Sequence, residues 1–292
     1  KIHMVTGKGG VGKSTVAAAL AHSLRQKERE VLLVELGDKS YFQYVFDLYT
    51  DHESRRLKPK LHVARWDGPS CLREYLLHYV RVPKVVDLFF ENPVMRALVD
   101  AAPALKELAI LGKITSGLRG VGPDLPFDDI VVDAYSTGHF LALMKAPIGM
   151  SEAIKFGPMG EQSRSIYETV INPQNTYLYV VTLLEELPVQ ETTELVDEIK
   201  THFRQAPRVF VNKTLRQPFD QSEAAQLRDE LQSSSSRRVL ELFEGFQSLW
   251  DQQNDHRKEL NELDVPTHEL PLRREHSAQK VIEELSVQLG EL

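Results

Sequence analysis

The chain has 292 residues, and 35 lysines and arginines against 42 aspartates and glutamates give it a net charge of −7 at neutral pH. This balance argues against broad nucleic-acid binding, and a single cysteine, Cys71, excludes a disulfide scaffold and zinc sites built on paired cysteines. No apolar run approaches the ~20 residues of a membrane span and no signal peptide is visible, so we expect a cytoplasmic protein.

Short apolar runs alternate with helical patterns along most of the chain. Apolar runs of this length, separated by helices, indicate a mostly parallel sheet that is covered on both faces. We therefore expect an α/β protein with a doubly wound, mostly parallel sheet. The predicted strands are residues 2–6, 31–36, 61–66, 130–133, 177–182, 208–212 and, with a weaker pattern, 265–270.

The stretch between residues 66 and 130 contains no convincing strand. Its apolar residues follow helical spacing instead, and prolines open or break each helix. We interpret this stretch as part of a helical insertion at about residues 41–118, within a single domain that covers residues 1–292. The predicted helices of the insertion are residues 69–80, 85–90, 94–101 and 104–118.

A glycine-rich loop between the first predicted strand and the first predicted helix carries the strongest functional signal. It matches G-x-x-x-x-G-K-[ST] with Gly7, Gly12, Lys13 and Ser14, in the strand–loop–helix context that this P-loop motif requires. The glycines let backbone N–H groups surround phosphate oxygens, Lys13 would neutralise the β- and γ-phosphates, and Ser14 would ligate Mg²⁺. The fold class is therefore a P-loop NTPase. The predicted phosphate-binding residues are Gly9, Gly10, Val11, Gly12, Lys13, Ser14 and Thr15.

Two further strand ends complete the predicted nucleotide site. Asp133 ends an apolar strand, where a carboxylate would hold Mg²⁺, usually through a water. Another strand ends at Asn212-Lys213-Thr214-Leu215. A guanine-specific site needs a carboxylate at the fourth of these positions. Leu215 cannot accept hydrogen bonds from guanine, so we expect ATP rather than GTP. An asparagine at a strand end is also a common turn former.

Lys8 and the segment after Asp133 resemble one group of P-loop ATPases. The run K-G-G-V-G-K-S at residues 8–14 is similar to the deviant P-loop pattern K-G-G-x-G-K-[ST], in which the first lysine reaches the nucleotide of a partner subunit. The run D-A-Y-S-T-G-H at residues 133–139 resembles the D-T-A-P-T-G-H element of the arsenical pump-driving ATPase family. That family includes the ATPase that targets tail-anchored membrane proteins. The chain is thus identified as a single-domain, bacterial-type member of it.

Other matches follow the order of this family along the chain. Residues 102–114 resemble its P-G-x-x-E helix, and residues 185–192 resemble its P-E-x-x-x-x-E-T segment. The family uses an asparagine at a strand end to read adenine and a late loop to close over the base. The resemblance therefore implies nucleotide contacts for Asn212, Lys213, Pro271 and Leu272.

Three departures from the family pattern matter. In its first switch segment, D-P-A-H, an aspartate positions the attacking water, but here Gly37 takes that place and Asp38 comes one residue later. Either Asp38 acts from a shifted backbone or hydrolysis is slow. The Cys-x-x-Cys pair that holds the targeting ATPase dimer through zinc is absent, so no zinc is expected. A single cysteine also cannot supply the arsenite-binding set of the pump ATPase.

The resemblance implies an ATP-hydrolysing molecular switch, in which a homodimer closes around ATP and Mg²⁺ and relaxes after ADP forms. The client would be a protein or a membrane-associated molecule, and no nucleic-acid partner is expected. Two alternatives stay open: a slow or non-hydrolysing ATP-dependent scaffold, and the motor of an arsenite pump. The predicted catalytic residues are Lys8, Lys13, Asp38 and Asp133, with Ser14 and Asp133 at the metal.

Residues 80–118 are rich in apolar side chains, and the Val85-Val86 and Phe89-Phe90 pairs spread them over more than one helical stripe. Large exposed apolar patches usually mark interaction sites. The insertion therefore either presents a nucleotide-gated apolar surface to a client or partner subunit, or consists of helices that bury one another.

Overall fold

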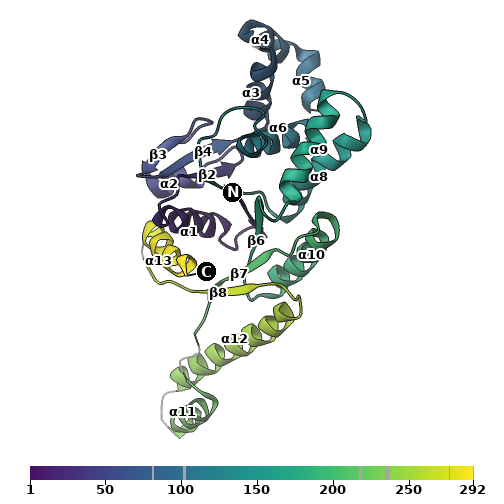
Figure 1. Cartoon of the computed structure of the whole chain (residues 1–292). Helices are drawn as coiled ribbons and strands as arrows, with labels where there is room; N and C mark the ends of the chain where they lie inside the picture. The colour runs from purple at the N-terminus through teal and green to yellow at the C-terminus, as the bar shows by residue number, and fades with distance from the viewer. Residues whose placement is uncertain (81, 101–102, 217–218, 234–236, 276, 292) are drawn as a thin grey trace.

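The computed structural model of the chain describes residues 1–80, 82–100, 103–216, 219–233, 237–275 and 277–291. In these residues eight strands form one sheet in the order β3-β4-β2-β5-β1-β6-β7-β8 (Figure 1). All neighbouring strands are parallel except β3 and β4. The strands are β1 (Ile2–Gly7), β2 (Val31–Leu36), β3 (Arg55–Lys58), β4 (Leu61–Trp66), β5 (Asp129–Asp133), β6 (Thr176–Thr182), β7 (Arg208–Thr214) and β8 (Thr267–Pro271).

Helices connect the strands and cover both faces of the sheet, which confirms the predicted α/β class and mostly parallel sheet. All seven predicted strands are present. The helices are α1 (Lys13–Gln26), α2 (Tyr41–Phe46), α3 (Gly68–Val80), α4 (Pro83–Glu91), α5 (Pro93–Asp100), α6 (Pro103–Ile114), α7 (Ser116–Arg119), α8 (Thr137–Ala153), α9 (Pro158–Ile171), α10 (Glu186–Phe203), α11 (Gln221–Ser233), α12 (Arg237–Asn261) and α13 (Ala278–Gly290).

The sequence pattern does not predict strand β3, which pairs antiparallel with β4 at the edge of the sheet. Its four residues include three cations and one leucine, so no apolar run marks it. Charged residues are common on edge strands because they discourage pairing with another chain. A turn at Lys60, which has a φ of +62°, precedes β4.

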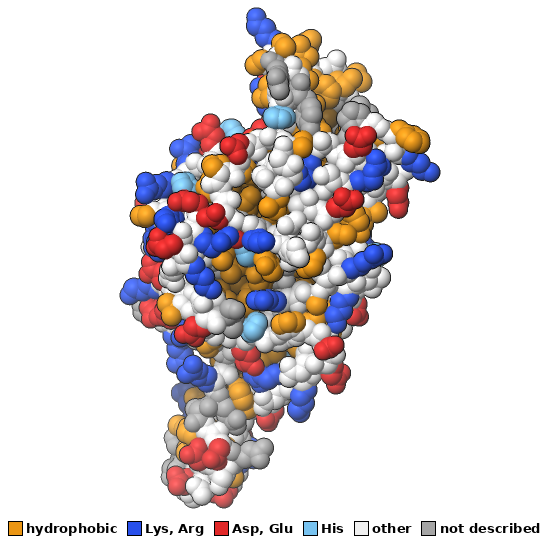
Figure 2. Space-filling view, in the orientation of Figure 1, with side chains coloured by type: hydrophobic (Ala, Val, Ile, Leu, Met, Phe, Trp, Pro, Cys, Tyr) orange, Lys and Arg blue, Asp and Glu red, His pale blue; other side chains and the backbone are white. Residues whose placement is uncertain are grey.

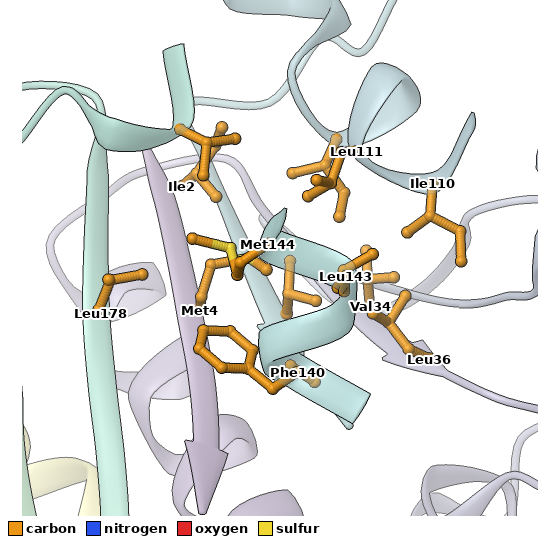
Figure 3. Packing of buried hydrophobic residues seen from close by; sticks show 14 of the residues in the cluster. Ile2, Met4, Val34, Leu36, Ile110, Leu111, Phe140, Leu143, Met144 and Leu178 are labelled. Atoms are coloured by element: carbon orange, nitrogen blue, oxygen red, sulfur yellow. The ribbon is translucent and has the colours of Figure 1, made fainter. Parts of the chain in front are cut away.

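The central strands are buried on both faces, so successive side chains enter two different cores. Ile2 and Met4 of β1 pack on one face with the helices α6, α8 and α10, whereas Val5 packs on the other face with α1 and α13. Figure 3 shows the first of these cores, in which Phe140 of α8 lies against the β1 side chains. Strands that are buried on both faces read as continuous apolar runs, which is why the sequence predicts them well.

The expected insertion at about residues 41–118 begins with α2 and contains strands as well as helices. Residues 55–58 and 61–66 form β3 and β4 of the main sheet, and the helices α3–α7 occupy Gly68 to Arg119. Figure 1 shows α4 and α5 extending beyond the sheet at the top of the view. Ala101 and Ala102, which fall at expected helix ends, lie outside the described residues.

The apolar pairs of the insertion divide between buried and exposed positions. Val86 is 2% exposed, and Phe89 and Phe90 are half-buried against the core of the first sheet face. Val85 is exposed, and other large apolar side chains near the same tip are exposed with it: Val80, Val82, Leu88 and Val94. The side chain of Leu98 lies outside the described part of the structure.

A second projection is formed by α11 and α12, which extend from the opposite end of the molecule in Figure 1. The two helices contact each other, and Phe219 lies beside Phe243 with ring centroids 6.3 Å apart. Across the described ranges of the chain, no helix is both long enough and apolar enough to cross a bilayer.

The split between Val86 and Leu88 yields a stability prediction. Val86→Asp should lower the free energy of unfolding by roughly 3 kcal/mol or more, because it buries an unpaired charge. Leu88→Asp is the matched control and should change it by less than ~0.5 kcal/mol, since Leu88 is 68% exposed. Urea denaturation measures both values, and equal losses in the two variants would contradict the described packing of α4.

Candidate nucleotide-binding site

The loop between β1 and α1 turns at three glycines with positive φ. Gly7, Gly10 and Gly12 have φ values of +141°, +87° and +96°, a region that favours glycine. A β-carbon at Gly7 would collide with the Val181 carbonyl of β6, and one at Gly12 would collide with the side-chain amide of Asn212. Close packing of the loop against β6 and β7 therefore requires glycine at both positions.

Helix α1 begins immediately after this loop. Gly12 caps it in a left-handed conformation, no side chain caps the first turn, and that turn contains no acidic residue. The first-turn N–H groups and the positive end of the helix dipole can therefore bind an anion. The Lys13 ammonium folds over the loop and donates to the Lys8 carbonyl at 3.1 Å. Burial lowers the pKa of Lys13, and the charge of Asp133 opposes this shift.

Asp133 ends β5 beside the loop and is 6% exposed. Its Oδ1 is buried without a hydrogen-bond partner among the described residues. Burial raises the pKa of Asp133 to about 7; Glu35 adds to this shift, whereas a hydrogen bond from Ser14 and the charge of Lys13 oppose it. Mg²⁺ prefers oxygen ligands, so an unpartnered carboxylate oxygen beside a serine hydroxyl fits this cation. The described residues contain no cluster of three metal-binding side chains, but Mg²⁺ bound to one or two protein oxygens and phosphates needs none.

Glu35 is a second buried carboxylate next to Asp133, and the sequence motifs do not predict a role for it. The two residues are register partners on the neighbouring strands β2 and β5. Glu35 is 5% exposed and accepts hydrogen bonds from the Ser40 hydroxyl at 2.6 Å and the Tyr41 backbone N–H at 2.5 Å. These bonds hold the start of α2 against the end of β2. A charged residue at the end of an otherwise apolar strand is the signal that could have found it.

Asp38 lies two residues beyond β2 and is exposed. Within the described part of the chain its carboxylate makes no hydrogen bond or ion pair, although Arg65 donates to its backbone carbonyl. It is also absent from the charges that shift the pKa of Asp133. The structure therefore leaves Asp38 outside the buried group of Asp133, Glu35 and Lys13.

Lys8 points back onto its own chain. Its ammonium lies 2.6 Å from Glu191 Oε1 on α10, and Glu191 Oε2 accepts a hydrogen bond from the Thr137 hydroxyl at 3.2 Å. Thr137 is the first residue of α8 and belongs to the run D-A-Y-S-T-G-H. Glu191 therefore joins the loop before α1 to the segment after β5, a link that its position in the sequence does not reveal.

Asn212 ties β7 to the phosphate loop. It is 6% exposed, its amide nitrogen donates to the Val11 carbonyl at 2.8 Å, and its Oδ1 accepts from the Lys213 N–H at 2.9 Å. Lys213 itself is exposed and has a φ of +55°. In the described structure Asn212 therefore holds the loop in place through a contact that the sequence does not predict.

The predicted base-closing residues lie beside a hollow of about 290 Å³. The Leu272 N–H donates to the Thr214 carbonyl at 2.9 Å, which fixes the chain after β8 against β7. Asn212 and Lys213 are not among the residues that line this hollow. Its lining consists of Thr214, Leu215, Arg216, Phe246, Pro271, Leu272, Arg273 and Arg274.

Several known proteins are similar to this chain in sequence. A family model described as anion-transporting ATPase matches residues 1–157. A putative ATPase of Mycobacterium bovis is 31% identical over 77% of this chain and 69% of its own length. An arsenical pump-driving ATPase of Acidiphilium multivorum is 27% identical over 66% of this chain and 36% of its own. The ATPase get3 of Schizosaccharomyces japonicus is 22% identical over 83% of both chains.

The family model covers more than half of the chain and includes the phosphate loop, Glu35 and Asp133. The mycobacterial relative extends the similarity over three quarters of the chain. The predicted family is therefore confirmed: the chain belongs to the anion-transporting ATPase family and is an ATPase.

Proposed function

We propose that this ATPase binds Mg²⁺-ATP on the backbone of Gly9 to Thr15 and works as a homodimeric, nucleotide-dependent switch. The observation that carries the proposal is the buried Asp133 Oδ1, which has no hydrogen-bond partner in the described part of the chain, on a carboxylate beside Ser14 and Lys13 at the end of the phosphate loop. An anion-binding helix start and a cation-binding carboxylate at one place suit a metal-bound nucleotide.

Each residue of the site has a proposed task. Lys13 neutralises the β- and γ-phosphates, and the N–H groups from Gly9 to Thr15 hold their oxygens. Ser14, and Asp133 through a water, would hold Mg²⁺, which supplies positive charge that balances the phosphates. We propose that Asn212 supports this loop, and that Lys213, Pro271 and Leu272 lie near the base.

Lys8 is proposed to exchange partners during the cycle. In the described chain its ammonium pairs with Glu191, and about a third of each side chain is exposed. A partly exposed ion pair of this kind contributes only about 1 kcal/mol to the free energy of unfolding, so a nucleotide phosphate can replace Glu191 as the partner of Lys8. Release of Glu191 would also free Thr137, the start of α8, which links nucleotide state to the segment after β5.

We propose a protein or membrane-associated client, a cytoplasmic location and no nucleic-acid partner. The exposed apolar side chains at the tip of α3–α5 support an apolar client surface: Val80, Val82, Val85, Leu88 and Val94. We also propose that residues 1–292 form one ATPase domain with a helical insertion at about residues 41–118, in which α3–α7 form the continuous helical part.

A switch with slow turnover is the second candidate, because Asp38 is exposed and apart from the buried carboxylates. Steady-state ATP hydrolysis distinguishes it from a fast switch. The arsenite-pump alternative loses support from Cys71, which is 2% exposed and whose thiol pKa burial raises to about 12. A buried thiol that stays protonated is a poor metalloid ligand.

Nucleotide binding should stabilise the protein through the phosphate loop. At 100 times its Kd, ATP should add about 2.7 kcal/mol to the free energy of unfolding, or roughly 5 °C in Tm. Lys13→Ala should remove most of this shift in a thermal melt with Mg²⁺-ATP, whereas Lys145→Ala, outside the loop, should keep it. An unchanged shift in Lys13→Ala would exclude this loop as the ATP site.

The buried carboxylate predicts a pH-dependent stability. Asp133 ionises near pH 4 in the unfolded chain but near pH 7 in the folded one. Between these values only the folded state binds the proton, so the stability of the nucleotide-free protein falls as pH rises from about 4 to 7. Asp133→Asn should remove this contribution and raise stability at pH 8 by roughly 2 kcal/mol or more, while ATP turnover falls. Identical pH profiles for the two proteins would contradict this.

Lys8→Ala should keep ATP binding but lose turnover and ATP-driven dimerisation. Sedimentation velocity with and without Mg²⁺-ATP measures the association, and a coupled ADP assay measures the turnover. Lys145→Ala is the matched control, because Lys145 forms a similar pair with Glu198 at 2.6 Å on α8 and α10. A Lys8→Ala monomer with full turnover would refute the proposed role, as would a wild-type dimer that depends on a chelatable metal without nucleotide.

A further inference from the structure

A cluster of polar side chains lies at the amino-terminal ends of the parallel strands, opposite the phosphate loop. His3 is the second residue of β1, Asp129 begins β5, Tyr177 is second in β6 and Arg208 begins β7. The phosphate loop follows the other end of β1. Six residues of strand separate the two ends by about 15–20 Å, so this group takes no part in the nucleotide site.

The centre of the group is a saturated hydrogen-bond chain. His3 is 5% exposed; its Nε2 lies 3.0 Å from Asp129 Oδ1 and its Nδ1 lies 3.1 Å from the Tyr179 hydroxyl. Burial lowers the pKa of His3, whereas Asp129 opposes this shift. A neutral ring with its proton on Nε2 would donate to the carboxylate and accept the tyrosine proton at Nδ1. Arg29 donates to Oδ2. Both carboxylate oxygens of Asp129 therefore already have donors.

Cations surround a hollow of about 360 Å³ next to this chain. Lys27 at the end of α1 and Arg208 at the start of β7 both line it, and neither makes an ion pair or side-chain hydrogen bond with another described residue. Asp129 is the one acidic residue in the described lining. The local charge is therefore positive, in a chain whose net charge is −7. The cationic residues of the lining are Lys1, Lys27, Arg29 and Arg208.

The floor of the same hollow is aromatic and apolar. The Tyr179 and Phe210 rings stack with centroids 5.4 Å apart and planes 5° apart, and His3 stacks on Tyr177 at 5.2 Å. Leu20, Leu24 and Leu289 add aliphatic surface. In Figure 2 orange side chains floor a recess that blue side chains surround, in the area between the two chain ends marked in Figure 1.

We propose that this hollow binds a small aromatic anion, a flat ring that carries a carboxylate or phosphate group. The ring would lie against Tyr177, which is half-buried, because Phe210 and Tyr179 are almost fully covered. The anionic group would bind Arg208 and Lys27. An arginine offers paired N–H donors that match carboxylate and phosphate oxygens. The lining combines aromatic and aliphatic side chains with convergent cations, which suits a small molecule that carries both a ring and an anionic group.

Isothermal titration calorimetry on the full-length protein tests the proposal with four probes. Phenyl phosphate and benzoate carry both ring and charge, inorganic phosphate lacks the ring, and benzyl alcohol lacks the charge. At least one ring anion should bind at least tenfold more tightly than inorganic phosphate and benzyl alcohol, and comparison of the two ring anions identifies the preferred head group. No saturable binding of either ring anion, or equal binding of all four probes, would overturn the proposal.

Variants locate the binding. Arg208→Gln and Lys27→Gln should each weaken binding of the ring anion about tenfold. Because Lys27 is exposed at the end of α1, Lys27→Gln should fold, and the test stays valid if Arg208→Gln does not fold. Arg238→Gln removes the same charge from the exposed surface of α12 and should leave the Kd unchanged. Lys13→Ala should also leave it unchanged, because the phosphate loop is a separate site. Loss of binding in Lys13→Ala, or an equal loss in Arg238→Gln, would refute the assignment.

Discussion

The nucleotide site depends on the burial of a carboxylate, with one oxygen unpartnered among the described residues, beside a tightly packed glycine loop. Asp133 lies almost out of solvent, and its register partner Glu35 is a second buried acid. Such an arrangement is costly without a compensating cation, because burial disfavours the charged form. Asp133 is the register partner of Val5 on β1, and the phosphate loop follows β1 directly. The fold therefore buries a carboxylate at a place where a metal-bound nucleotide would stabilise its charged form.

Hydrogen bonds connect this loop to the elements that a switch would move. Glu191 joins Lys8 to Thr137 at the start of α8, Asn212 joins β7 to the loop, and Glu35 holds the start of α2 through Ser40. The links through Glu191 and Asn212 bridge segments that are distant in sequence, whereas Glu35 joins the end of β2 to the helix that follows it. All of them meet at the carboxyl ends of parallel strands. Ligands of open α/β sheets bind at this edge. A change in phosphate charge can therefore reach α2, α8 and α10 directly.

The sequence predicts the parts of this protein whose residue pattern has one dominant physical cause. Continuous apolar runs indicate β1, β2 and β5 because these strands are buried on both faces. Gly7 and Gly12 of the phosphate loop are recognisable because a β-carbon at either position would collide with a neighbouring strand. Strand β3 escaped prediction because its residues are mostly charged. The roles of Glu35 and Glu191 escaped because each depends on a neighbour brought close only by the fold. The motif predicts a role for Asp38, but this residue is exposed. Glu35 and Asp133 lie side by side because both are buried on neighbouring strands.

We propose above all that the phosphate loop and its buried carboxylate form an ATP site that a second subunit completes. A crystal structure with ADP, Mg²⁺ and aluminium fluoride is the sharpest test. We expect nucleotide on the loop, Asp133 linked to Mg²⁺ through a water, and each Lys8 released from Glu191 and bound to the nucleotide of the other subunit. A monomer in which Lys8 still pairs with Glu191, or a nucleotide bound away from Asp133, would contradict it.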